Sequence, residues 1–336
     1  MELENDDRVT EFKQLMHLDE ESGEISLPEL RKFLLLPFPE GHPDLRFYNW
    51  QLSLKVLPLR RELWKKTWEK RDIQYYGLVE RMFRDSPDFL DYGLRSGRVM
   101  ESIDVLTNIH GDVIRMPKWL RAIYQIVDNP EQNHIHLHRL ERLIYVFSLV
   151  NSHCPYTQGF HELAAPLYYV SLAGTRALSM SDDRAESIAF FLLFNLIIGT
   201  NLYTVFANVE DLEKMKMRFK TIENAVKVFD APFAQFLFEE KAIHPLLFCL
   251  SWVSMLFSQH LELLDLLHLW DHLLVFYDRV VDFVMMVAAA YILFRKKKIR
   301  QLDFDQILTE LHTTPEMNIM PMLRIARNLW DQLFES

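Results

Sequence analysis

An arginine that could neutralise an anion follows a short helical pattern in the first half of the chain. Ile109, Asp112 and Arg115 recur every three residues, so on a helix they lie along one side. Pro117 disfavours helical geometry at the residue before it, so we expect the helix to end near Arg115. A carboxylate one turn earlier would then hold the guanidinium. The simplest alternative is an arginine that complements the helix dipole and pairs with Asp112.

A glutamine forms the second part of the pattern, in the run Tyr-Thr-Gln-Gly at residues 156–159. Pro155 and Gly159 bracket this run, so we expect Gln158 on a turn before an apolar helix at residues 163–172. An amide on a turn usually makes local hydrogen bonds. An arginine and a glutamine on rigid helix ends are, however, also the groups that GTP hydrolysis needs from outside. The first stabilises charge on the transferred phosphoryl group, and the second orients the attacking water.

Both stretches resemble motifs of the TBC-domain proteins, which activate Rab GTPases. The pattern I-x-x-D-x-x-R at residues 109–115 is similar to one family motif, and Y-x-Q-G at residues 156–159 is similar to another. The resemblance implies that Arg115 and Gln158 are catalytic fingers supplied in trans, the glutamine taking over the water-positioning role of the Rab's own glutamine. The other residues of the two motifs would support the fingers: Ile109, Asp112, Tyr156 and Gly159.

Two further blocks extend the resemblance over about residues 50–295, with four motifs in the family's order. The run Pro-Leu-Arg-Arg-Glu-Leu-Trp at residues 58–64 resembles the N-terminal block, and residues 252–271 resemble the third block. No single motif is specific, but the combination is. The residues expected to serve these blocks structurally are Arg60, Trp64, Trp252, Trp270 and Asp271.

The chain departs from the family pattern at several positions. Met116 replaces a common threonine after the arginine, and Phe160-His161 replaces the usual Met-Asn after the glutamine motif. Residues 55–58 lack the Gly-x-Pro of the first block, and Ser251 stands where a basic residue often precedes the tryptophan. These departures favour an alternative function, a catalytically weak or inactive TBC-like scaffold that binds a GTPase or a trafficking adaptor.

The resemblance implies an all-α fold, a TBC-type helical domain of two packed helical lobes. We expect residues 1–40 to form an acidic N-terminal segment with one short helix, and residues 41–335 to form the domain. Residues 41–180 would be the lobe that carries both fingers, and residues 181–335 would be the C-terminal helical lobe. Within the first lobe, apolar periodicity predicts helical structure at residues 49–68, interrupted by Pro58, and a separate helix at residues 76–83.

Composition excludes several other classes of protein. Of the 336 residues, 49% are hydrophobic and the net charge is −10, which argues against general nucleic-acid binding. Nine glycines and no strand–turn rhythm argue against a sandwich or a dinucleotide-binding fold. The chain has no phosphate-binding P-loop, so it is not itself a P-loop hydrolase. Two cysteines give no disulfide framework, which fits a reducing compartment.

Cofactors and partners follow from the resemblance. We expect no cofactor of the chain's own; GTP and Mg²⁺ would be carried by a GTP-bound Rab partner, and a trafficking adaptor is a further candidate partner. The expected location is cytoplasmic and transiently at endomembranes, with peripheral membrane association allowed. His134 and His138 have the spacing of metal ligands on one helix face, but no Cys or carboxylate cluster accompanies them. We therefore expect no metal site, and exposed or cap-proximal histidines at 134, 136 and 138.

Three apolar stretches raise the alternative of a membrane protein. Residues 187–209 and 242–261 carry no charge and are long enough to span a bilayer, and residues 283–294 are too short. Polar residues interrupt the two long stretches, so we expect buried helices of a large core instead. The basic cluster at residues 295–300 is most simply a charged helix C-terminus. Weak attraction to an anionic membrane is its alternative.

Overall fold

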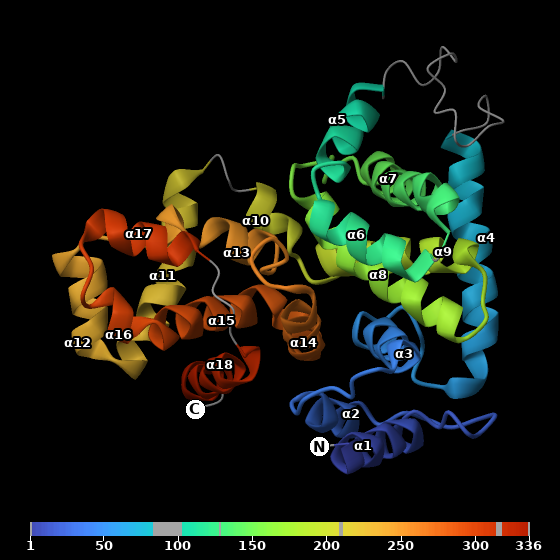
Figure 1. Cartoon of the computed structure of the whole chain (residues 1–336), viewed down its shortest axis with the longest axis horizontal. Helices are drawn as coiled ribbons and strands as arrows, with labels where there is room; N and C mark the ends of the chain where they lie inside the picture. The colour runs from blue at the N-terminus through green and yellow to red at the C-terminus, as the bar shows by residue number, and fades with distance from the viewer. Residues whose placement is uncertain (1, 83–102, 128, 208–210, 314–317, 335–336) are drawn as a thin grey trace. The chain divides into compact units, whose positions relative to one another are not determined.

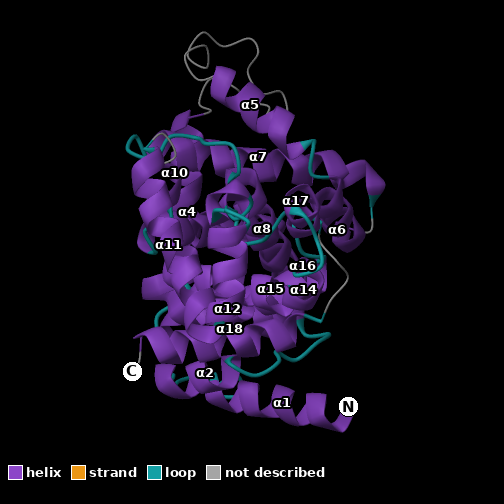
Figure 2. Ribbon diagram, turned by 90° about the vertical axis from the view of Figure 1, so that its left-hand side faces the viewer, coloured by secondary structure: helices purple, strands orange, loops and turns teal. Residues whose placement is uncertain are grey.

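The computed structural model describes residues 2–82, 103–127, 129–207, 211–313 and 318–334, and it is all-α over these ranges (Figure 1). Figure 2 shows helices and connecting loops throughout this part of the chain. The all-α prediction is confirmed. Contacts divide the chain into two compact units, Met1–Ile197 and Ile198–Ser336. The expected division into residues 1–40, 41–180 and 181–335 stays a prediction.

The first forty residues contain two helices, α1 (Glu2–Leu15) and α2 (Leu27–Leu34), rather than the one that the sequence predicts. Ser26 is the N-cap residue of α2. Charged residues are distributed around the additional helix, α1, so its apolar periodicity is weak. It is held by burial of Phe12, whose ring centroid lies 5.3 Å from that of Phe33 on α2. Tertiary packing therefore decides this helix, as it does for most short helices.

Helix α4 (Trp64–Met82) runs without interruption, so the prediction of a separate helix at residues 76–83 was wrong. Tyr75 is fully buried in the middle of α4, and its hydroxyl donates to Glu186 at 2.6 Å. This long-range anchor stabilises the charged stretch of α4 despite Gly77, a residue that costs a helix about 1 kcal/mol relative to alanine. Local periodicity could not reveal a contact across 111 positions.

Helix α8 (Phe160–Ala177) lies in the core of the first unit and contacts helices α3, α6, α7 and α9 (Figure 1). Most of its side chains are buried, which explains why its sequence is apolar on nearly every side. Helix α5 contacts both α7 and α8. The other elements of this part are α3 (Pro43–Ser53), η1 (Arg61–Leu63), α5 (Ile103–Val113), α6 (Pro117–Val127), η2 (Pro130–Gln132), α7 (Asn133–Val150), α9 (Asp182–Phe194) and the π-helical turn η3 (Asn195–Gly199).

A buried carboxylate joins three helices of the first unit. Glu186 on α9 is fully buried and accepts hydrogen bonds from Arg142 Nε at 2.5 Å and from Arg139 at 2.7 Å, both on α7. Tyr75 of α4 donates to the same carboxylate. Removing one cation from this cluster should be destabilising, because the buried carboxylate would lose part of the charge that compensates it.

Helix α15 (Val280–Phe294) forms the core of the second unit, as the apolar sequence predicts, and it contacts α11, α13, α14 and α18. Trp252 and Trp270 are buried in the same unit; the Trp270 indole N–H donates to the Leu256 carbonyl at 3.0 Å. The remaining elements are α10 (Tyr203–Ala207), α11 (Leu212–Phe229), α12 (Ala231–Ala234), the π-helical η4 (Gln235–Glu240), η5 (Pro245–Leu247), α13 (Leu250–Ser254), α14 (Leu263–Leu273), η6 (Leu274–Arg279), α16 (Lys296–Ile299), α17 (Phe304–His312) and α18 (Ile319–Phe334).

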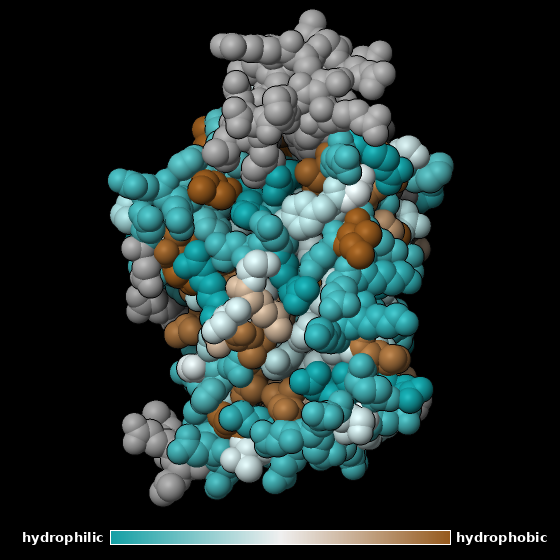
Figure 3. Space-filling model, turned by 90° about the vertical axis from the view of Figure 1, so that its right-hand side faces the viewer, coloured by the Kyte–Doolittle hydropathy of each residue, from teal (hydrophilic) through white to brown (hydrophobic). Residues whose placement is uncertain are grey.

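Among the described residues, none of the helices combines the length and the hydropathy needed to cross a bilayer. On the face drawn in Figure 3, hydrophilic side chains predominate and hydrophobic ones are scattered among them. The basic cluster at residues 295–300 is largely paired within its own unit. Lys296 lies 2.9 Å from Asp230, and Lys298 lies 2.7 Å from Glu310. This pairing favours a charged helix end over a surface kept for anionic lipid.

Candidate functional site

Arg115 stands just beyond the C-terminus of α5, where the sequence predicts it. The helix ends at Val113, and the backbone N–H of Arg115 closes a turn onto the Asp112 carbonyl at 3.2 Å. Pro117 then begins α6. The Arg115 side chain is 67% exposed, and its guanidinium donates a hydrogen bond to Asp112 Oδ1. The cation is therefore held at its base and open to solvent over most of its surface.

Asp112 connects the arginine motif to the glutamine motif. Its side chain is 9% exposed; Oδ1 accepts from Arg115, and Oδ2 accepts from the Tyr156 hydroxyl at 2.6 Å, across 44 positions of sequence. Burial, and then the neighbouring Asp112 carboxylate, raise the pKa of the Tyr156 hydroxyl. The hydroxyl therefore stays protonated at neutral pH and remains a donor. One carboxylate thus fixes both motifs.

Gln158 lies on an exposed turn immediately before α8, as the sequence predicts. Gly159 is the N-cap residue of α8 and has a φ of 112°, in the left-handed region that favours glycine. The helix begins at Phe160, slightly earlier than the predicted start at residue 163. The backbone of Gly159 therefore sets the direction in which the chain presents Gln158.

Contacts made by Ile109 and His110 hold α5 in place. Ile109 is fully buried, in agreement with its expected supporting position. His110, beside it, places its Nδ1 2.7 Å from Oε1 of Glu141, a carboxylate of α7 that is itself fully buried. His138 of α7 lies 3.0 Å from the other oxygen of Glu141. This cluster ties the helix that carries Arg115 to its neighbour.

A further side chain at the site, His161, is not among the residues that the sequence singles out as functional. It is buried on the first turn of α8, and its Nδ1 lies 3.2 Å from the Tyr156 hydroxyl oxygen and 3.6 Å from Asp112 Oδ2. Burial lowers the pKa of His161; Asp112 opposes this shift and Arg115 adds to it. The signal that could have found this residue is its departure from the family's asparagine.

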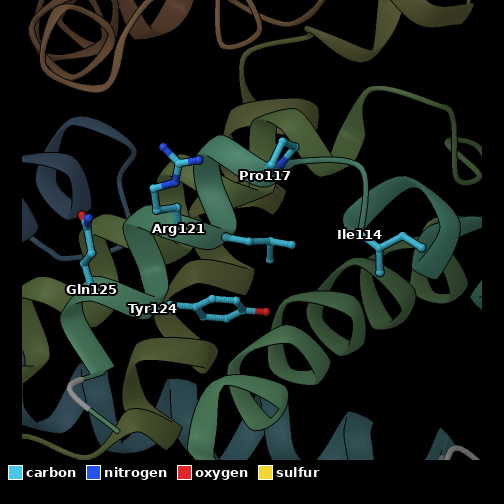
Figure 4. Close-up of a pocket in the computed structure, with 6 residues that line it drawn as sticks. Ile114, Pro117, Arg121, Tyr124 and Gln125 are labelled. Carbon is cyan, nitrogen blue, oxygen red and sulfur yellow. The ribbon is translucent and has the colours of Figure 1, made fainter. Parts of the chain in front are cut away.

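A shallow apolar pocket borders the arginine turn (Figure 4). Its volume is about 480 Å³, and Ile114 and Pro117 stand on either side of Arg115 in sequence. The Tyr124 ring projects from α6 into this hollow (Figure 4). The residues that line it are Ile114, Pro117, Leu120, Arg121, Tyr124 and Gln125.

The remaining motif residues make contacts with residues other than Arg115 and Gln158. Trp64 is buried and donates its indole N–H to the Pro58 carbonyl at 2.9 Å. These contacts indicate a structural residue. Arg60 is 64% exposed and pairs with Glu62. Trp252, Trp270 and Asp271 are buried in the core of the second unit.

The histidine run on α7 corrects one expectation. His136 is 1% exposed, and its Nδ1 lies 2.8 Å from the Tyr168 hydroxyl, so it is buried rather than exposed, although it lies in the first turn of α7. The tertiary contact with α8, invisible in local sequence, accounts for its burial. His134 is exposed and His138 is partly buried. In the part of the chain that the structure describes, no group of three or more His, Cys, Asp and Glu side chains could hold a metal ion.

Comparison with known proteins identifies the fold that carries this site. The model of the Rab-GTPase-TBC domain family matches residues 46–300, most of the chain. The chain belongs to the RabGAP-TBC family. The TBC-type fold implied by the motifs is therefore confirmed.

The curated relatives are distant but match much of this chain. TBC1 domain family member 13 of mouse is 25% identical over 209 residues, which are 62% of this chain and 50% of that protein. Human TBC1 domain family member 22B is 22% identical over 330 residues, covering 93% of this chain and 58% of that protein. The chain thus spans about half the length of the curated relatives it matches.

Two solved TBC structures share the fold. The Ypt/Rab-GAP domain of Gyp1p superposes with a TM-score of 0.74 and 16% identity, covering 98% of this chain and 99% of that one. The Chlamydomonas flagellar RabGAP TBC domain gives a TM-score of 0.63 and 15% identity, covering 98% of this chain and 93% of that one. At these identities the likeness establishes the fold.

Proposed function

We propose that this chain is a GTPase-activating protein for a Rab-family GTPase. In the proposal, Arg115 and Gln158 act as fingers in trans on GTP that the partner holds with its Mg²⁺. The observation that carries it is the exposed Arg115 guanidinium, fixed by a buried Asp112 that also accepts the hydroxyl of the glutamine motif's tyrosine. A cation and an amide are thereby presented from rigid elements, which electrostatic catalysis requires.

Each finger has a defined chemical task in this proposal. Arg115 neutralises negative charge that develops on the γ-phosphoryl oxygens as the bond to the leaving oxygen lengthens. Gln158 accepts a hydrogen bond from the attacking water and orients it in line with that bond. The chain supplies no nucleotide site of its own, so it contributes only groups that complete the partner's site.

Location and further partners belong to the same proposal. A Rab substrate would bring the protein from the cytoplasm to endomembranes transiently. A trafficking adaptor and peripheral membrane association stay predictions, because they rest on the family resemblance alone. The chain's acidic net charge of −10 supports partners other than nucleic acid.

The decisive experiment measures phosphate release from a panel of GTP-loaded Rabs, with and without this protein. We expect at least one Rab to be stimulated, and Arg115→Ala to reduce that stimulation by about a thousand-fold, the scale on which arginine fingers act. Arg324→Ala, on the exposed side of α18, is the matched control and should leave stimulation unchanged.

Two outcomes would redirect the proposal. Binding of a GTP-loaded Rab without stimulated phosphate release would favour the alternative function, a TBC-like scaffold. Full stimulation by Arg115→Ala would show that the arginine is not the catalytic cation. Gln158→Ala separates the fingers: a severe loss is expected where the partner relies on this glutamine rather than its own.

A further inference from the structure

One buried imidazole contacts both halves of the finger site. His161 lies on the first turn of α8 and is 6% exposed. Its Nδ1 is 3.6 Å from Asp112 Oδ2, on the arginine side. The same atom is 3.4 Å from the backbone nitrogen of Gly159, the residue that follows Gln158. The ring is thus placed where it can influence both fingers.

A single proton decides which contacts Nδ1 makes. In the neutral tautomer that carries its proton on Nε2, Nδ1 accepts a hydrogen bond from the Gly159 N–H and so supports the glutamine turn. In the imidazolium both ring nitrogens carry a proton, so Nδ1 becomes a donor. It then releases the Gly159 amide and faces two acceptors, the Tyr156 oxygen at 3.2 Å and Asp112 Oδ2. The Tyr156 hydroxyl already donates its own hydrogen to Asp112, so its oxygen can accept a hydrogen bond from the imidazolium N–H.

The charge of the imidazolium bears directly on Arg115. The charged and titratable groups that face His161 are Asp112 and Arg115, from the end of α5, and Tyr156, from the preceding turn. A protonated ring would be a second cation on the Asp112 carboxylate and would compete with the guanidinium for it. The two cations would also repel each other, because both would lie close to the same buried carboxylate.

We propose that His161 is a positioning residue that couples the two fingers. In its neutral form it supports the turn of Gln158 and leaves Asp112 to Arg115; in its protonated form it releases the turn and weakens the hold on the arginine. This inference rests on the proposed function of the two fingers. Asparagine, the usual family residue here, takes no proton in this range, so the coupling would be a property of this chain.

The expected consequence is loss of stimulation in mild acid. Burial lowers the pKa of His161 from its ordinary value, so the ring stays neutral at neutral pH and takes its proton at a lower pH than a solvent-exposed histidine. Stimulated hydrolysis should therefore be highest where the ring is neutral and should fall as the pH drops through the histidine's titration.

A pH profile of stimulated phosphate release, on a Rab that responds to the wild-type protein, tests this inference. The intrinsic rate of the Rab is subtracted at each pH, and each variant is normalised to its own rate at neutral pH. We expect the wild-type rate to fall about twofold or more on acidification, and His161→Asn to give a flatter profile. His153→Asn, at an exposed position of the loop that precedes α8, should behave as wild type. Parallel profiles for wild type and His161→Asn would overturn the proposal.

A second measurement needs no GTPase. The His161 ring resonance, identified by its loss in His161→Asn, is titrated by NMR in the wild-type chain and in two variants. Asp112→Asn should lower the pKa of His161, and Arg115→Ala should raise it, because these groups act on it in opposite directions. Unchanged titration in both variants would refute the coupling. If no Rab is stimulated but the titrations shift as expected, the proposed function fails and the coupling to Asp112 and Arg115 stands.

Discussion

Two arginine–carboxylate pairs in the first unit differ in how far the arginine is exposed to solvent. Arg142 is 6% exposed and pairs with Glu186, which also accepts bonds from Arg139 and Tyr75. Arg115 is 67% exposed and pairs with Asp112, whose other oxygen is occupied by Tyr156. In both pairs the carboxylate is buried, but only in the second is the guanidinium presented to solvent. The first pair serves stability, and the second leaves its cation available to a partner.

The comparison is tested most strongly by Arg142→Ala. We expect it to lower the free energy of unfolding by about 3–5 kcal/mol, because Glu186 would lose its closest cation while remaining buried. Chemical denaturation monitored by tryptophan fluorescence measures this loss. A change below about 1 kcal/mol would mean that burial does not distinguish the two pairs.

Acid should lower the folding stability of the chain through protonation of the buried His136. Burial lowers the pKa of His136 from 6.5 to about 4, against the opposing effect of Asp182. The unfolded chain binds the proton first as the pH falls, so folding stability should decrease between pH 6.5 and about 4. The loss reaches about 3 kcal/mol at the acid end, from 1.36 kcal/mol per pKa unit.

His136→Gln sharpens this prediction, because glutamine keeps a polar contact for Tyr168 without titrating. The free energy of unfolding of the variant should change less between neutral and acid pH than that of the wild type. Equal pH dependence of the two proteins would show that other groups cause the acid sensitivity.

The link between the two motifs predicts an intermediate effect for Tyr156→Phe. The change removes the hydroxyl that donates to Asp112 and leaves the ring, so we expect a loss of about 1–2 kcal/mol in unfolding free energy. Stimulated phosphate release should fall about tenfold, because Asp112 would position the Arg115 guanidinium less firmly. A tenfold loss corresponds to about 1.4 kcal/mol of transition-state stabilisation. Unchanged values in both assays would mean that Asp112 fixes Arg115 without help from the glutamine motif.

The smallest effect on stability is expected for Arg115→Ala. The Arg115 guanidinium is mostly exposed, and the buried Asp112 carboxylate keeps the hydrogen bond from the Tyr156 hydroxyl. We therefore expect the free energy of unfolding to change by less than about 1 kcal/mol, although stimulation is lost. Denaturation of the same preparation used in the phosphate-release assay provides the measurement. A large destabilisation would make Arg115 a structural residue and weaken its proposed catalytic task.

Local sequence was sufficient wherever a short-range constraint decides the structure. Pro117 correctly limited the helix that precedes Arg115, and Gly159 correctly placed Gln158 on a turn. The family resemblance added the fold class. These features depend on spacing and on backbone preferences, both of which are visible in one sequence.

Long-range contacts decided the features that sequence missed. The uninterrupted α4 depends on Tyr75 reaching Glu186, and the burial of His136 depends on Tyr168. The place of His161 beside Asp112 depends on a turn and a helix end that only the folded chain brings together. Periodicity carries no record of such contacts, because each partner satisfies its local pattern equally well without the other.

The turn at Gly159 gives experimenters a direct means of trapping the partner. Its left-handed backbone, at a φ of 112°, is a property of the glycine and owes nothing to the exposed side chain before it. A photo-crosslinking amino acid at position 158 should therefore be presented in the orientation of the native glutamine. Irradiation in a cell extract, followed by peptide sequencing, would report which protein surface approaches this position.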